Sequence, residues 1–293
     1  MIASTVALAR HGQENGYGIP AVNIFDDLSL RAVVKAAEVS SAPIIIQASV
    51  KTARTIGVDL LTKMFRQAAT QARVPVALHL DHCPDREMIK QVVAAGWSSI
   101  LFDASDRDLE TATRETAEVV AEAHAAGVEI ECEIENIIGV EDGVGSDVAV
   151  HSYSTQQLVE LLERTGADML APHLGTAHGA YVSRPHLLPG RVRELVALTD
   201  RPIVLHGGTG LTESEFAEFI AAGVSKINIS TALKQTYMQA AAGHLDKARE
   251  TAHWDPPSMF RDVSTAVQKV VEGYIRQFGT HGRAASAEKH VGR

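Results

Sequence analysis

The feature that most restricts the fold of this chain is a regular alternation of short apolar runs with longer amphipathic stretches. Eight apolar runs of strand length begin roughly 23 to 40 residues apart. They span residues 19–24, 43–47, 76–80, 99–102, 128–132, 169–172, 202–205 and 226–229. Between them, apolar residues recur every three or four positions, as helices require, and several stretches end in glycine just before the next run. The pattern is therefore one of strands alternating with helices.

Such alternation predicts an α/β fold in which helices cover a parallel sheet. Eight strand–helix units in about 230 residues predict a (β/α)8 TIM barrel. An open doubly wound sheet is the alternative, but no GxGxxG motif follows the first run. We expect residues 1–293 to form a single barrel domain, with extra C-terminal helices over about 235–278. The small, basic and polar residues from about 281 to 293 predict a flexible tail.

Composition narrows the class of protein. The chain is 45% hydrophobic, enough for a large core, yet no run reaches the roughly 20 apolar residues that span a bilayer. Its start lacks the basic region of a signal peptide, and its two cysteines suit a reducing cytosol. The net charge of −9 argues against a nucleic-acid partner. We expect a cytoplasmic enzyme with a small-molecule substrate.

Three histidines lie just after predicted strands, in the segments LHLDH, GTAHG and LHGGTG. Active sites of (β/α)8 barrels lie at these strand ends. His82, His178 and His206 would leave a fourth position free for substrate, as a catalytic zinc site requires. Their long spacing excludes a zinc finger. Singly, each could be a hydrogen-bonded rim residue; together they favour a metal site.

Acidic residues accompany the histidines. Asp81 precedes His82, and neighbouring strand residues point to opposite sides, so we expect Asp81 off the metal, as a proton-transfer group. The alternative is that it orients an imidazole. Glu133 is a further candidate ligand, because a carboxylate inside a barrel needs a nearby cation. Glu141 lies in a glycine-containing loop that could close over substrate with a base or be an exposed acidic turn; the residues alone leave both open.

Three loops of small residues follow the last predicted strands, at 175–179, 207–210 and 228–231. Exposed backbone N–H groups and hydroxyls in such loops bind anions, and the loops after strands seven and eight form the usual phosphate site of this fold. The chain should therefore bind a phosphorylated ligand.

These motifs, in this order and with KINIST after them, make the chain resemble the class II, zinc-dependent ketose-bisphosphate aldolases over nearly its whole length. The resemblance implies cleavage of a fructose- or tagatose-1,6-bisphosphate type of substrate to dihydroxyacetone phosphate and an aldehyde. It implies zinc on His82, His178 and His206, with Glu133 able to join them. Asp81 would exchange a proton with the substrate hydroxyl, and Glu141 would move the proton on the enediolate carbon.

The resemblance implies further contacts. Asn228 would contact the enediolate, and Asn23 and Ser49 would contact substrate. The phosphate would be held by Gly179, Gly207, Gly208, Thr209, Ser230 and Thr231. A monovalent cation, Na+ or K+, is expected near the glycine loops, and a homo-oligomer, a dimer or tetramer, is common in the family.

The chain departs from the family pattern at several places. Glu135 replaces a glycine, which should stiffen the loop base and add a carboxylate near the rim, and His173 replaces a small residue. The basic residue expected after Asp255-Pro256 is missing, so binding of a second phosphate is open, with Arg54 or Arg261 as substitutes. A specialised pathway with a non-standard aldehyde is thus an alternative, as is a partner-dependent or non-catalytic subunit.

A zinc hydrolase of the amidohydrolase type is disfavoured, because the first strand ends in Asn23 rather than an HxH pair. A non-catalytic paralogue is disfavoured because Asp81 and the three histidines are all present.

Overall fold

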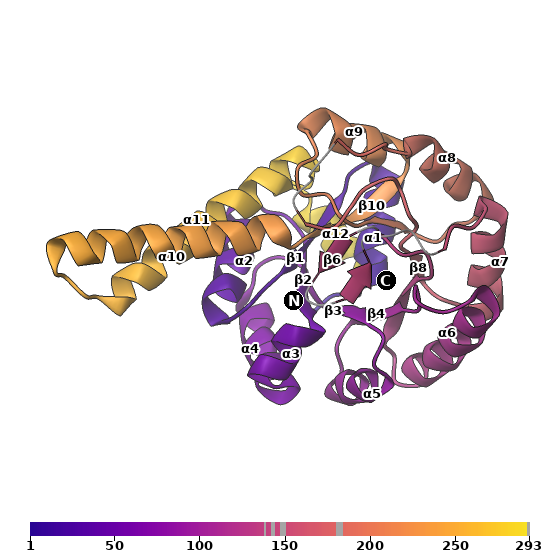
Figure 1. Ribbon diagram of the computed structural model, residues 1–293, viewed down its shortest axis with the longest axis horizontal. Helices are drawn as coiled ribbons and strands as arrows, with labels where there is room; N and C mark the ends of the chain where they lie inside the picture. The colour runs from indigo at the N-terminus through magenta and orange to yellow at the C-terminus, as the bar shows by residue number, and fades with distance from the viewer. Residues whose placement is uncertain (138, 142–143, 147–150, 180–183, 292–293) are drawn as a thin grey trace.

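The computed structural model describes residues 1–137, 139–141, 144–146, 151–179 and 184–291, with only the backbone given for residues 140, 141, 144–146 and 291. Eight parallel strands close into a barrel in the order β1-β2-β3-β4-β5-β8-β9-β10 (Figure 1). They are β1 (Ile19–Asn23), β2 (Ile44–Ser49), β3 (Val76–Cys83), β4 (Ser99–Asp103), β5 (Glu129–Glu133), β8 (Met169–Leu170), β9 (Ile203–Leu205) and β10 (Val224–Ile229). The predicted (β/α)8 barrel is confirmed.

Helices cover the outside of the barrel, one after nearly every strand (Figure 1). They are α2 (Asp27–Val39), α3 (Val50–Ile56), α4 (Val58–Gln71), α5 (Arg86–Ala95), α6 (Leu109–His124), α7 (Thr155–Thr165), α8 (Pro189–Leu198) and α9 (Glu213–Ala222). Local sequence sets their ends. For example, the Asp85 carboxylate accepts hydrogen bonds from the first turn of α5, and Gly96 ends that helix at a φ of 70°, which glycine adopts without strain.

Helix α1 (Thr5–Asn15) closes the N-terminal end of the barrel, which the strand–helix pattern did not predict. The Glu129 carboxylate, at the start of β5, accepts hydrogen bonds from the Ser4 hydroxyl and the Val6 amide. Apolar side chains of α1 also pack on the lower barrel interior, such as Leu8 on β1 and β2. This plug leaves the opposite end, where the strands finish, as the open mouth.

The strands bury apolar residues on their outer side and polar ones within. Outward residues such as Leu78 and Ile100 join one large core with the helices. In the interior, Gln47, His79, Glu131 and Lys226 are all 0% exposed. Such groups are tolerated there because each has a polar partner inside the barrel: Gln47 has Asn23, His79 has Ser99, and Glu131 has Lys226. They form the floor under the mouth.

A β-bulge interrupts β3 at Asp81 and His82. Leu80 pairs with Ile100 of β4, but the next pair joins Cys83 to Phe102, so two residues of β3 oppose one residue of β4. His82 takes the left-handed conformation, with φ of 44°, which is rare outside glycine. A bulge re-aims side chains, and here it turns both Asp81 and His82 toward the barrel mouth. The expectation that they point to opposite sides is wrong, because it assumed an unbroken strand.

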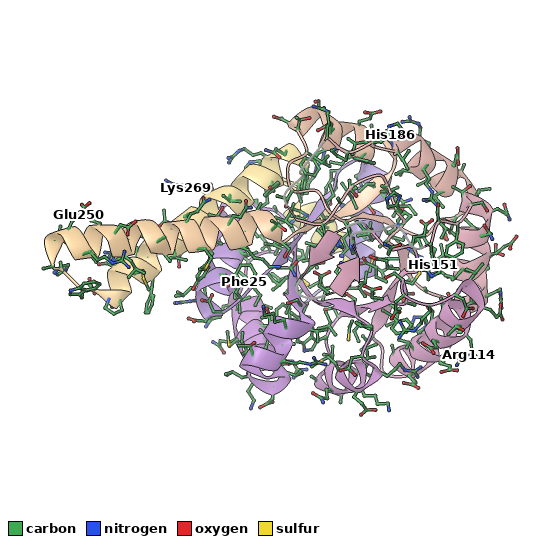
Figure 2. The ribbon with its side chains drawn as sticks, in the orientation of Figure 1. Phe25, Arg114, His151, His186, Glu250 and Lys269 are labelled. Atoms are coloured by element: carbon green, nitrogen blue, oxygen red, sulfur yellow. The ribbon has the colours of Figure 1, made fainter. Side chains whose placement is uncertain are left out.

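The C-terminal region confirms the expected extra helices. Helices α10 (Thr231–Thr251) and α11 (Pro256–Gln277) form a hairpin that projects from the barrel (Figure 1), and Glu250 marks its far end in Figure 2. The segment for which we expected a flexible tail contains helix α12 (Ala284–Val291), which packs on α1. Ala287 is fully buried there, so its small, apolar surface supplies the packing. None of the described helices combines the length and apolar content needed to cross a bilayer.

Candidate metal centre

Three histidines from different strand ends converge at the mouth of the barrel. His82 ends β3, His178 lies in the segment after β8, and His206 directly follows β9. Their ring centroids are 4.8 to 6.0 Å apart, and each is less than 9% exposed. One nitrogen of each lies within 4.8 Å of the others. Two nitrogens on one tetrahedral zinc lie about 3.4 Å apart, so the three ligand nitrogens would need to approach one another by at most about 1.4 Å to hold the ion.

Two carboxylates orient these imidazoles. Asp103 Oδ2 lies 3.0 Å from His82 Nδ1, and Glu131 Oε1 lies 2.9 Å from His206 Nε2. If each carboxylate accepts the ring proton, the two remaining nitrogens carry lone pairs. Those nitrogens, His82 Nε2 and His206 Nδ1, face each other at 3.0 Å. Two lone pairs at that distance repel unless a proton or a metal ion lies between them, so the arrangement is one that a cation stabilises.

Glu133 adds a third carboxylate beside the rings. Its Oε2 lies 3.4 Å from His206 Nδ1, is buried, and accepts no hydrogen bond from the described part of the chain. Burial raises the pKa of Glu133 well above its usual value. Burial alone would lower the pKa of His82, but Glu133, Asp81 and Asp103 raise it well above its usual range. The same negative field would attract a cation.

Asp103, at the end of β4, joins the cluster although no sequence motif contains it. It forms a second set of ligand atoms with His82 and Glu133, again within 4.8 Å of one another. Burial would raise the pKa of Asp103, but His82 and, after it, the hydrogen bonds from Ser105 lower that pKa to about 2. Its place at the inward-facing end of β4 was the available signal.

Asp81 is held beside the histidines by amide groups. Its Oδ2 accepts a hydrogen bond from Asn23 Nδ2 at 2.8 Å, and its Oδ1 accepts one from Asn228 Nδ2 at 3.1 Å. Asn23 is fixed in turn by Gln47 Nε2, which donates to its Oδ1 at 2.8 Å. Asn228 Nδ2 also lies 3.1 Å from His206 Nε2. Asp81, Asn23 and Asn228 therefore lie directly against the histidine cluster.

The small-residue loops gather at the same mouth. Gly207 has a φ of 65°, and a Cβ there would lie 2.5 Å from the Ala177 carbonyl oxygen, so only glycine fits. Gly208 packs against Phe216, and a Cβ would lie 3.0 Å from its ring. The Ser230 hydroxyl is buried and has no hydrogen-bond partner within the described ranges. Thr209 and Gly179 lie on the loops after β9 and β8, and Thr231 is the first residue of α10, shortly after β10.

The hydrogen bonds above do not include two of the predicted site residues, Ser49 and Glu141. Ser49 caps helix α3, with its hydroxyl accepting the Thr52 amide at 3.3 Å. Glu141 ends the short strand β6 (Gly139–Glu141), which pairs antiparallel with β7 (Val144–Ser146). The Glu141 side chain lies outside the described residues.

Glu135 does not supply the expected rim carboxylate. It is 0% exposed and lies 2.8 Å from Arg191 Nη2 on α8. It also accepts hydrogen bonds from the backbone amides of Tyr153 and His173. These partners occupy the carboxylate, which thereby connects the segments of Tyr153, His173 and Arg191 below the rim.

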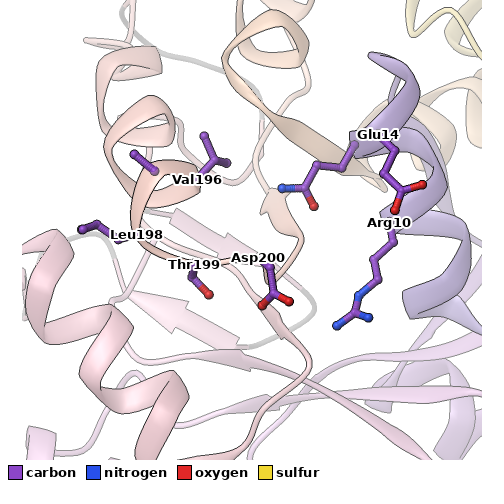
Figure 3. Close-up of a pocket in the computed structure, with 8 residues that line it drawn as sticks. Arg10, Glu14, Val196, Leu198, Thr199 and Asp200 are labelled. Atoms are coloured by element: carbon purple, nitrogen blue, oxygen red, sulfur yellow. The ribbon is translucent and has the colours of Figure 1, made fainter.

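A surface cavity of about 560 Å³ lies elsewhere, between α1 and the end of α8 (Figure 3). Arg10 and Glu14 come from α1, and Leu198, Thr199 and Asp200 precede β9. These elements mark the N-terminal end of the barrel, opposite the mouth where (β/α)8 enzymes bind substrate. The cavity is therefore not the candidate active site.

The barrel and its mouth define a class: a (β/α)8 protein with a metal-capable histidine cluster and an adjacent carboxylate. The chain belongs to the class-II fructose-bisphosphate aldolase family, whose model matches residues 3–283. The family is zinc-dependent, and its members are lyases.

Similar proteins support this placement. The fructose-bisphosphate aldolase of Staphylococcus epidermidis is 34% identical over 275 residues, covering 93% of this chain and 95% of the relative. That of Geobacillus stearothermophilus is 34% identical over 274 residues, covering 92% and 94%.

Solved structures agree. The YdjI aldolase from Escherichia coli K12 superposes with a TM-score of 0.84 at 30% identity, covering 97% of this chain and 100% of that one. The fructose-bisphosphate aldolase of Campylobacter jejuni shares the fold, with a TM-score of 0.81 at 22% identity and 96% of each chain covered.

Proposed function

We propose that this chain is a zinc-dependent aldolase that cleaves a phosphorylated ketose reversibly to dihydroxyacetone phosphate and an aldehyde. The observation that carries the proposal is the position of Asp81. Its carboxylate is held by two amides, and one of them, Asn228, lies 3.1 Å from His206 of the histidine cluster. An ionised carboxylate beside a cation site, rather than on it, suits a base that acts on a substrate hydroxyl.

The reaction follows from these groups. Asp81 takes the proton of the hydroxyl on the carbon that becomes the aldehyde. The carbon–carbon bond then breaks, and its electron pair passes to the former ketone as an enediolate. Asn228, whose NH2 group faces Asp81, donates a hydrogen bond to that negative oxygen. Glu141, assigned by resemblance, returns a proton to the enediolate carbon and completes dihydroxyacetone phosphate.

His82, His178 and His206 would hold the zinc, with Glu133 as a further ligand. Bound there, zinc supplies Lewis-acid polarisation of the ketone and stabilises the developing charge. The loops after β8, β9 and β10 would hold the phosphate through Gly179, Gly207, Gly208, Thr209, Ser230 and Thr231, with Asn23 and Ser49 contacting substrate. The same loops are where we would place a Na+ or K+ ion.

The experiment is to measure dihydroxyacetone phosphate release, coupled to its reduction, from a panel of ketose mono- and bisphosphates with and without EDTA. Turnover that EDTA abolishes and zinc restores supports the proposal. Turnover that persists in EDTA contradicts it. The panel also separates two substrate classes: use of bisphosphates points to a fructose- or tagatose-1,6-bisphosphate type of substrate, and use of monophosphates alone to a specialised pathway.

The proposal extends to the state of the protein in the cell. We expect a cytoplasmic homo-oligomer, a dimer or tetramer, as is common in the family. Light scattering of the purified, zinc-loaded protein gives its mass directly, and a monomer would contradict this part of the proposal.

A further inference from the structure

A buried lysine lies directly beneath the candidate active site and has no part in the reaction above. Lys226, on β10, is 0% exposed inside the barrel. Its Nζ lies 2.7 Å from Asn228 Oδ1 and 2.8 Å from Glu131 Oε2. A buried ammonium is costly unless such partners compensate it, so these two contacts define what the lysine does.

The first contact sets which way the Asn228 amide points. An ammonium group has only donors, so the group facing it must be an acceptor. Asn228 therefore presents its oxygen to Lys226 and its NH2 to Asp81 Oδ1, 3.1 Å away. With the amide reversed, an oxygen would face the Asp81 carboxylate and an NH2 would face the ammonium. Both contacts would then repel, and no donor would face the reacting oxygens.

The second contact reaches the histidine cluster. Glu131 uses one oxygen for Lys226 and the other for His206 Nε2, at 2.9 Å. Lys226 thus compensates the charge of the carboxylate that orients His206. His79 lies 3.7 Å from the same Glu131 oxygen, but burial and Lys226 lower the pKa of His79 well below its usual value. Lys226 is therefore the basic group that this network of carboxylate, amide and imidazole groups surrounds.

We propose that Lys226 is a positioning residue for the aldol reaction: it holds the Asn228 amide with its NH2 group toward Asp81 and the enediolate oxygen. The proposal rests on the proposed function, because it assigns Asn228 to the enediolate. It does not make Lys226 a nucleophile, since its amine is ion-paired and lies below the strand ends.

The test uses exchange of the carbon-bound hydrogen of dihydroxyacetone phosphate with D2O, followed by proton NMR on the zinc-loaded protein. This reaction forms the enediolate without any aldehyde. Asn228→Ala should slow exchange about 10²-fold, the usual effect of losing one oxyanion donor, and Lys226→Met should slow it at least about tenfold. If Lys226 acts through Asn228, the double variant should be no slower than Asn228→Ala. If the rate losses of the two single variants multiply in the double variant, the proposal is overturned.

Two additions keep the test decisive. Lys226→Met leaves Glu131 buried without its cation. The comparison of the two single variants with the double variant is therefore repeated in protein that also carries Glu131→Gln. The same non-additivity is expected there, with equal zinc content by metal analysis. If the wild-type protein shows no exchange, the proposed function falls and the positioning role with it; if only the additivity fails, the proposed function stands.

A second readout needs neither metal nor substrate. In zinc-free protein labelled with 15N-asparagine, the side-chain NH2 signals of Asn228 are assigned by their loss in Asn228→Ala. Lys226→Met should shift them, whereas Lys269→Met, on the exposed face of α11, should not. Unshifted signals in Lys226→Met would overturn the proposal.

Discussion

The Nδ2 atom of Asn228 on β10 lies 3.1 Å from Oδ1 of Asp81 on β3, although two strands separate them around the barrel. Asn23 of β1 and Gln47 of β2 fill the space between. Both Asp81 oxygens thus accept amide hydrogen bonds, which hold the carboxylate in one place. The base is positioned by four adjacent strands rather than by its own loop.

Replacing Asp81 should abolish turnover but not zinc binding. Asp81→Ala removes the proton acceptor, while the histidines and Glu133 remain, so kcat should fall about 10²- to 10⁴-fold. Asp81→Asn, which keeps the shape without the basicity, should be similarly impaired. The measurements are steady-state rates and zinc content on the same samples. Loss of zinc together with activity would mean that Asp81 belongs to the metal site instead.

Removing the partner of His82 should weaken metal binding. Asp103 Oδ2 lies 3.0 Å from His82 Nδ1, so Asp103→Asn should lower zinc affinity about 10- to 100-fold, the usual effect of losing such a partner. Competition with a chromophoric chelator measures the affinity. His178→Ala should lower it more, because a ligand is lost. Wild-type zinc affinity in His178→Ala would refute the proposed ligand set.

Breaking the Glu135–Arg191 pair should destabilise the fold. Arg191→Met leaves the Glu135 carboxylate buried without its cation, which costs about 3–5 kcal/mol of unfolding free energy. Glu135→Gln/Arg191→Met removes both charges and should recover part of that loss. Urea denaturation of the wild type and both variants tests this. A single variant within about 1 kcal/mol of wild type would show that the pair contributes little.

Stability should fall as the solution becomes acidic, in part through His11. Burial lowers the His11 pKa, and His290 and Arg283 lower it further, while Glu14 opposes them. Burial also raises the pKa of Tyr17 to about 12, so the tyrosine stays a donor to His11 Nδ1 at 2.5 Å. Because the folded pKa lies below the unfolded value of about 6.5, this contribution is complete above that pH and is lost below it.

Thermal unfolding between pH 7.5 and pH 5 measures the effect. His11→Gln should show a smaller decrease in Tm over this interval than the wild-type protein, because one proton-linked group is gone. The control is His186→Gln, in a surface segment away from α1 and α12. An equal pH dependence in His11→Gln and wild type would exclude His11 as a contributor.

The eight strands could be predicted because each is marked in the local sequence by a short apolar run. Amphipathic stretches, several of which end in glycine, lie between these runs. The histidines could be predicted because strand ends in a closed parallel barrel must meet at one mouth. Helix α12 was not predictable from its mostly polar residues, since Ala287 contributes to the core only when it packs against α1 and its neighbours.

The tertiary structure decided what depends on distant partners. The bulge that brings Asp81 and His82 to the same side is a mismatch of register between β3 and β4, which no local pattern in LHLDH encodes. Glu135 is buried because Arg191, 56 residues later, reaches it. Lys226 orients Asn228 only inside a closed barrel. The sequence by itself determined which polar residues stand at the end of each strand around the mouth, because the strands follow from local periodicity. Which of these groups pair, and in which direction each points, was decided by the closed barrel, because those contacts form between strands.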